Sequence, residues 1–261
     1  MPQLAAGEPT PPAKDEPIDP DILRKVRKLV QGTLAEDEAA REKAWTELRS
    51  MGNLAVPGLL GLYRQPETTP AMMRSILICL GDSKDPRAGP ALLEMMRSKE
   101  TSVRRDAARA LGDSGWKDSV SALDALAANE KEEPEVRLFA GVAAAKMGSS
   151  KAIEVLAGFL QQQKPEIRSR AVFALGKYGG VSQISQLTKA LDDEDQSVRE
   201  DAVEALRGVG KKEVYPALVK ATADGNYKVR NSAMDALKEL TGEKLETPQA
   251  WREWMAKNSK Q

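Results

Sequence analysis

The stretch Val198–Leu206 reads Val-Arg-Glu-Asp-Ala-Val-Glu-Ala-Leu, and its pattern occurs four more times in the chain. Each copy has Val or Ile, then Arg, then Ala three residues after the arginine, and Leu or Ala seven residues after it. The arginines of the five copies are Arg104, Arg137, Arg168, Arg199 and Arg230. They are separated by 33, 31, 31 and 31 residues. A regular period of this size is typical of a protein built from stacked structural repeats.

Each repeat is predicted to contain two helices. Apolar residues recur at helical spacing through Val198–Leu206, and Gly210 ends that helix. A second helical face follows, with Val214 and Leu218 on it. The same pattern predicts first helices near 36–51, 70–82, 100–113, 133–147, 165–177, 195–208 and 227–240, and second helices near 54–64, 87–97, 118–128, 150–162, 181–191, 212–223 and 248–257.

The ends of the array are expected to be closed by capping helices, because a terminal repeat has no neighbour to cover it. We predict one solenoid domain at 20–261, with a capping helix at 20–35, repeats at 36–245 and a second capping helix at 246–261. Six prolines fall within the first 20 residues. Residues 1–19 are therefore predicted to be a disordered, proline-rich tail or tether.

The localisation stays open at this stage. A cytoplasmic protein is the default expectation, and no apolar run has the length of a membrane-spanning helix. If residues 1–8 are the remnant of a trimmed signal peptide, the protein would instead be exported or tethered to the cell envelope.

The segments Val103–Gly112 and Ile167–Gly176 resemble the short bacterial HEAT repeats, also described as HEAT-like or PBS-lyase-type repeats. The resemblance covers roughly residues 36–245. It implies an all-α fold, a right-handed α-solenoid of about six to seven stacked antiparallel helix pairs, with the second helices lining a concave face. In this family an aspartate often forms a ladder with the motif arginine. The pairs Asp193 with Arg199 and Asp224 with Arg230 fit that arrangement, so all five motif arginines are interpreted as structural.

Composition excludes several classes of function. The chain has no histidine, which removes the commonest general base and metal ligand. Lys and Arg together number 39, as do Asp and Glu, so we do not expect nucleic acid to be a partner. The single cysteine, Cys79, is interpreted as a small buried apolar residue. The acidic clusters near 130–135 and 192–195 are interpreted as solvated loops that cap helices. We therefore expect no catalytic residue, no metal and no cofactor.

We predict a non-enzymatic scaffold or assembly module that binds another protein or peptide on the face of the second helices. Stacked helices offer a rigid surface that loses little entropy on binding, and the tail could act as a tether. The candidate partner-binding residues are Trp116, Glu154, Phe159, Gln186, Lys189, Tyr215 and Lys220. The alternative is an enzyme on a HEAT-like fold, such as a bilin lyase or a nucleic-acid-binding, glycosylase-type protein.

Overall fold

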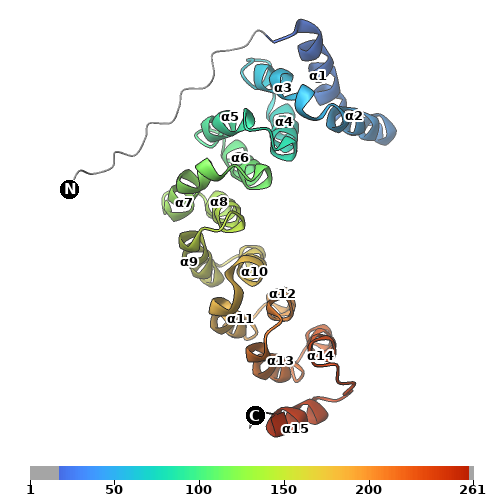
Figure 1. Cartoon of the computed structure of the whole chain (residues 1–261), viewed down its shortest axis with the longest axis vertical. Helices are drawn as coiled ribbons and strands as arrows, with labels where there is room; N and C mark the ends of the chain where they lie inside the picture. The colour runs from blue at the N-terminus through green and yellow to red at the C-terminus, as the bar shows by residue number, and fades with distance from the viewer. Residues whose placement is uncertain (1–17, 259–261) are drawn as a thin grey trace, which may run out of the picture. The chain divides into compact units, whose positions relative to one another are not determined.

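The computed structural model describes residues 18–258 and is all-α over this range (Figure 1). The predicted all-α fold of stacked helix pairs is confirmed. Of the predicted tail, only Ile18 and Asp19 are described, and the last three residues of the C-terminal cap also lie outside the described range. The chain divides into two compact units, Met1–Trp116 and Lys117–Gln261, which are considered separately below.

The first unit holds the N-terminal helices. These are α1 (Pro20–Gly32), α2 (Glu38–Ser50), α3 (Val56–Tyr63), α4 (Pro70–Ser83), α5 (Ala88–Met95) and α6 (Thr101–Ser114), with the 3-10 turn η1 (Gly52–Leu54) before α3. Helix α1 packs on α2 and α3, and α4 packs on α6. Asp19 caps α1 by accepting a hydrogen bond from the Asp21 amide at 2.8 Å. The helix predicted to cover this end therefore starts at a capped, well-defined residue.

The second unit holds the remaining helix pairs. Its α-helices are α7 (Val120–Ala128), α8 (Pro134–Lys146), α9 (Ser150–Gly158), α10 (Pro165–Ala174), α11 (Ile184–Ala190), α12 (Gln196–Val209), α13 (Tyr215–Ala221), α14 (Tyr227–Thr241) and α15 (Pro248–Asn258). Figure 1 shows the first helices α8, α10, α12 and α14 in one row, and the second helices α7, α9, α11 and α13 in another. Helix α15 packs on α13 and buries Trp251 completely.

The repeated alanines and leucines form the core. The motif alanines Ala171, Ala202 and Ala233, and the motif leucines Leu175, Leu206 and Leu237, have no exposed surface. Small side chains let consecutive first helices approach closely. A Cβ added to Gly176 of the α10 segment would lie only 2.5 Å from the Cβ of Ala205 in α12. The aromatic-poor composition therefore follows from the close stacking of the helices.

Short turns of other helical types interrupt the second unit. The 3-10 turns are η2 (Lys117–Ser119), η3 (Phe159–Gln161), η5 (Gly180–Gln183) and η6 (Lys212–Val214). Helix α10 differs from every other described first helix, because it ends in the π-helical turn η4 (Leu175–Gly179). Gly180 follows with φ 61° and ψ −151°, a backbone conformation that is essentially restricted to glycine.

Cys79 lies inside α4 and is buried, as predicted. Burial raises the pKa of its thiol to about 12, so the side chain is protonated and unreactive at neutral pH. Over residues 18–258 we find no helix with the length and apolar character needed to cross a membrane.

Candidate functional site

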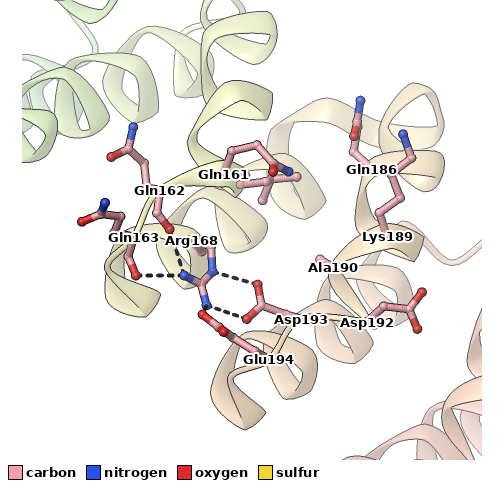
Figure 2. A pocket seen from close by; sticks show the side chains of 11 residues that line it. Gln161, Gln162, Gln163, Arg168, Gln186, Lys189, Ala190, Asp192, Asp193 and Glu194 are labelled. Atoms are coloured by element: carbon pink, nitrogen blue, oxygen red, sulfur yellow. Dashed lines mark hydrogen bonds and ion pairs between the residues drawn. The ribbon is translucent and has the colours of Figure 1, made fainter.

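Arg168, near the start of α10, is the most fully bonded side chain of the second unit (Figure 2). Its Nε and Nη2 atoms donate to the two carboxylate oxygens of Asp193 at 2.8 and 2.7 Å. Its Nη1 atom donates to the carbonyls of Gln162 and Gln163 at 2.8 and 3.0 Å, and Nη2 also reaches Glu194 at 3.4 Å. A guanidinium has five N–H donors. All five are used within the protein, so Arg168 holds the repeats together and has no donor left for a ligand.

The same bonding continues through the next two repeats. The Nη1 atom of Arg199 donates to the Asp193 carbonyl at 2.8 Å, and its Nε atom donates to the Asp224 carboxylate at 2.9 Å. The Asp224 carbonyl in turn accepts a hydrogen bond from Arg230 at 2.7 Å. We call this chain of Arg168, Asp193, Arg199, Asp224 and Arg230 the arginine seam.

The expected pairing of carboxylates within the seam is wrong in its register. We expected Asp193 to pair with Arg199 and Asp224 with Arg230, six residues later in each case. The structure instead pairs each aspartate with the arginine 25 residues earlier, in the preceding repeat. The arginine six residues later bonds only the backbone carbonyl of that aspartate. Each aspartate therefore connects two consecutive arginines through two different groups.

Hydrogen bonds within the seam shift the pKa values of Arg168 and Asp224. The hydrogen bond to Asp193 raises the pKa of Arg168 above its ordinary value. Burial raises the pKa of the Asp224 carboxyl, but hydrogen bonds from the Arg199 guanidinium and the Asn226 amide outweigh burial and leave that pKa below its ordinary value. Both groups are consequently ionised at neutral pH.

Next to the seam lies a hollow of about 470 Å³ between the η3 and α10 side and the α11 side. It is lined by Leu160, Gln161, Gln162, Gln163, Arg168, Gln186, Lys189, Ala190, Asp192, Asp193 and Glu194. In Figure 2, Gln161 lies on one side of it, and Gln186 and Lys189 lie on the other. We refer to this feature as the amide hollow.

Several polar groups of the amide hollow are available to a ligand. Within the described part of the chain, the side chains of Gln161, Gln163, Gln186 and Lys189 have no hydrogen bond or ion pair. The carboxylates on its rim are engaged. Asp192 binds the ammonium of Lys220 at 2.6 Å, while Asp193 binds Arg168. The hollow therefore offers unused amides, which both donate and accept, and one unpaired ammonium.

The structure brings three of the seven predicted binding residues to this region. Gln186 and Lys189 line the hollow, and Lys220 lies beside it through its ion pair with Asp192. Glu154 is exposed on α9 but does not line the hollow. Sequence reasoning missed Gln161 and Gln163, although the uninterrupted run Gln161-Gln162-Gln163 was a usable signal.

The three predicted aromatic contacts are packing residues in the structure. Phe159 was expected on the outside of a second helix, and this expectation is wrong because its side chain is buried with the Arg137 guanidinium 5.3 Å from its ring. The ring of Tyr215 lies 5.8 Å from that of Trp254, and its hydroxyl donates to the Leu240 carbonyl at 3.2 Å. In the first unit, Trp116 packs so closely on α5 that a Cβ on Gly89 would lie 2.3 Å from the indole.

Metal-binding chemistry finds little support in the side chains. Among residues 18–258 there is no group of three or more His, Cys, Asp or Glu side chains placed to hold a metal ion. The whole sequence has no histidine.

Comparison with known proteins identifies the family. The HEAT repeats family matches four overlapping segments, residues 67–133, 98–176, 124–207 and 184–250, which together cover more than half of the chain. The chain belongs to the HEAT-repeat family. The resemblance inferred from the motif is thus confirmed, although nothing shows a bacterial origin, because the curated relatives are fungal.

Two curated relatives carry the name of an enzyme. "Deoxyhypusine hydroxylase" of Neosartorya fischeri is 29% identical over 141 residues, covering 49% of this chain and 41% of the relative. "Deoxyhypusine hydroxylase" of Aspergillus clavatus is 28% identical over 136 residues, covering 49% and 40%. The chain therefore spans about two-fifths of the length of these relatives. Our expectation of a non-enzymatic protein is contradicted by these names.

A solved structure shows the same fold. The structure of Kap95p with RanGDP is 14% identical, has a TM-score of 0.62, and matches over 92% of this chain and 36% of that one. At this level of identity the likeness establishes the repeat fold alone.

Proposed function

We propose that the chain binds a polypeptide segment of a partner protein on the face of its second helices, with the amide hollow at the centre. The observation that carries this proposal is the contrast inside the hollow itself. Every N–H donor of Arg168 is hydrogen-bonded within the protein, while the side chains of Gln161, Gln186 and Lys189 make no hydrogen bond. Polar groups left unused in a recess are available to a ligand at no cost in broken internal bonds.

The chemistry of the hollow suits a peptide backbone. Each glutamine amide can donate to a peptide carbonyl and accept from a peptide N–H, so the pair of opposing glutamines can engage an extended segment from both sides. Lys189 adds one positive charge, which favours a segment carrying an isolated carboxylate near that point. Lys220 contributes less, because its ammonium is already held by Asp192 at 2.6 Å.

The proposal is tested by capture and crosslinking. The full chain carrying a photo-crosslinking amino acid at Gln186 is used to capture proteins from source cells, beside a variant with the same group at Glu154. The crosslinked partner should be obtained from the Gln186 position and lost in a Gln161→Ala/Lys189→Ala double variant. If the double variant retains the same partner at the same yield, the amide hollow is not the binding site.

An enzyme related to the hydroxylases is the second candidate, and it is supported by the names of the two curated relatives. Hydroxylation of a C–H bond needs an activated oxidant, which proteins often generate at an iron centre with histidine and carboxylate ligands. The residues present do not fit such a centre, since the chain lacks histidine and its described part lacks a cluster of metal-binding side chains. We therefore assign no step of a hydroxylation to any residue.

A direct assay tests the second candidate. The purified full chain, supplied with Fe(II) in air, is incubated with a deoxyhypusine-containing protein, and the product is analysed by mass spectrometry. A gain of one oxygen atom that depends on the chain would support a hydroxylase. An unchanged substrate, under conditions where an authentic hydroxylase converts it, would remove this candidate.

A further inference from the structure

A second surface of the C-terminal unit, on the first helices and away from the amide hollow's lining, alternates cations with aromatic rings. The Arg170 guanidinium of α10 lies 5.2 Å from the ring of Phe139 in α8. The Lys177 ammonium of η4 lies 5.4 Å from the ring of Phe173 and 5.7 Å from that of Tyr178. Arg170 and Phe173 are three residues apart on one helix and are therefore neighbours on its surface. We call Phe139, Arg170, Phe173, Lys177 and Tyr178 the α10 strip.

Phe173 of the α10 strip is one of five large apolar side chains that are exposed within residues 18–258; the others are Leu34, Leu54, Val181 and Tyr227. Phe173 leaves 59% of its surface open to solvent, and Val181, just beyond the π turn, leaves 54%. By contrast, Leu175, Leu187 and Leu206 on the same and neighbouring elements are buried. Aromatic residues and arginine are enriched at protein–protein interfaces, so Phe173 with Arg170 beside it suits a partner-binding surface.

The backbone under the α10 strip is unusual as well. Lys177 and Tyr178 lie in the π turn η4, and Gly180 directly after it has φ 61° and ψ −151°. Single π-helical turns are rare and are frequently found at functional sites. No other described first helix ends in this way. The α10 segment therefore differs from the other repeats both in its π-helical end and in the exposure of Phe173 and Val181.

The charges of the α10 strip are uncompensated. Within residues 18–258, neither Arg170 nor Lys177 has an ion pair or a hydrogen bond to a carboxylate. Each cation lies near an aromatic ring, and both residues are exposed to solvent. A partner that brings carboxylates to these two positions, with large apolar groups for Phe173 and Val181, would complement both features.

We propose that the α10 strip binds a segment of another protein in which acidic and large apolar side chains alternate. Single-stranded nucleic acid also combines charge with stacking, but it brings a negative charge with every nucleotide. The strip has only two cations, and Glu166 is exposed one turn before Arg170 on the same helix. A peptide can place its carboxylates only where the cations are, so the sparse charge favours a peptide.

The test is a binding titration with defined probes. A short fluorescein-labelled peptide of alternating Glu and Leu is titrated with the full chain and followed by fluorescence anisotropy at moderate salt. Binding should weaken by at least about tenfold in Arg170→Glu/Lys177→Glu, because each reversed charge then repels the peptide. Phe173→Ser provides a second variant, and its exposed position should leave the melting temperature unchanged.

Matched controls separate this surface from the amide hollow. Lys189→Glu reverses a charge in the hollow and should leave peptide binding unchanged, whereas the proposed function predicts that it weakens capture of the partner. The same peptide with Lys in place of Glu should not bind. The proposal is overturned if the wild-type chain does not bind the Glu–Leu peptide, if the α10 variants bind it as well as the wild type, or if oligo(dT) competes for the same residues.

Discussion

Arg168 and Arg137 occupy the same position in consecutive repeats of one unit, and they are bonded in different ways. Arg168 binds the Asp193 carboxylate of the following repeat through two hydrogen bonds. Arg137 donates from Nε to the Ala127 carbonyl at 2.9 Å and lies over the Phe159 ring. The position 25 residues after Arg137 is Gln162, which cannot supply a carboxylate. The motif therefore specifies the place of the arginine, while a distant residue decides how it connects the repeats.

The largest expected effect is the loss of Arg168. Arg168→Ala removes a buried ion pair and two bonds to carbonyls, so we expect the free energy of unfolding to fall by about 3 kcal/mol. Arg137→Ala should cost only about 1–2 kcal/mol, because it loses one hydrogen bond to a neutral carbonyl and a ring contact. Urea denaturation of both variants measures the difference. Equal losses would mean that the carboxylate adds nothing to the seam.

The next effect concerns pH. Because the folded pKa of Asp224 is lowered, its ionised form stabilises the fold above the unfolded pKa of about 3.9, and this stability is lost as the pH falls through the folded pKa. Asp224→Asn should cost about 2 kcal/mol at neutral pH. Its deficit relative to the wild type should close below pH of about 4. Thermal melts at several pH values test this, and a deficit that persists in acid would assign the loss to packing.

A smaller effect should follow from giving Arg137 the carboxylate partner that it lacks. Gln162→Asp places a carboxylate 25 residues after Arg137, the spacing seen in the seam, and should raise the free energy of unfolding by about 0.5–1 kcal/mol. Gln163→Asp, one residue away, is the matched control and should give no gain. If both variants behave alike, or if the gain survives in an Arg137→Met background, no new ion pair has formed.

The smallest effect is expected at the edge of the amide hollow. Lys220 and Asp192 are both more than half exposed, so their ion pair should contribute less than about 0.5 kcal/mol in a double-mutant cycle. Added salt should remove most of that value. A larger, salt-insensitive coupling would show that this pair is more than a surface contact.

The fold could be predicted well because its signal is local. Helix α12 (Gln196–Val209) was expected at 195–208 and α14 (Tyr227–Thr241) at 227–240, since helical periodicity and glycine end signals lie within each segment. The burial of Cys79 followed from its apolar neighbours in the same way.

The candidate site was less predictable because it depends on geometry between repeats. Phe159 was placed outside by extending the helical period from 150 to 162. Helix α9 ends at Gly158, and the 3-10 turn η3 then rotates Phe159 inward. The register of the Arg168–Asp193 pair was also missed, because it is set by the distance between neighbouring helix pairs. Sequence periodicity along one helix contains no information on that distance.

The double use of Asp193 has a consequence for how this chain can vary in length. Its carboxylate binds Arg168 and its carbonyl binds Arg199, so one residue fixes the spacing to both arginines. Adding or deleting a residue between Arg168 and Asp193 would displace the Asp193 carboxylate from Arg168, and a change between Asp193 and Arg199 would break the second connection. From Arg168 to Arg230 both gaps are 31 residues, whereas the gap from Arg104 to Arg137 is 33. Insertions should therefore be tolerated between Arg104 and Arg137, upstream of the seam, and rejected within it.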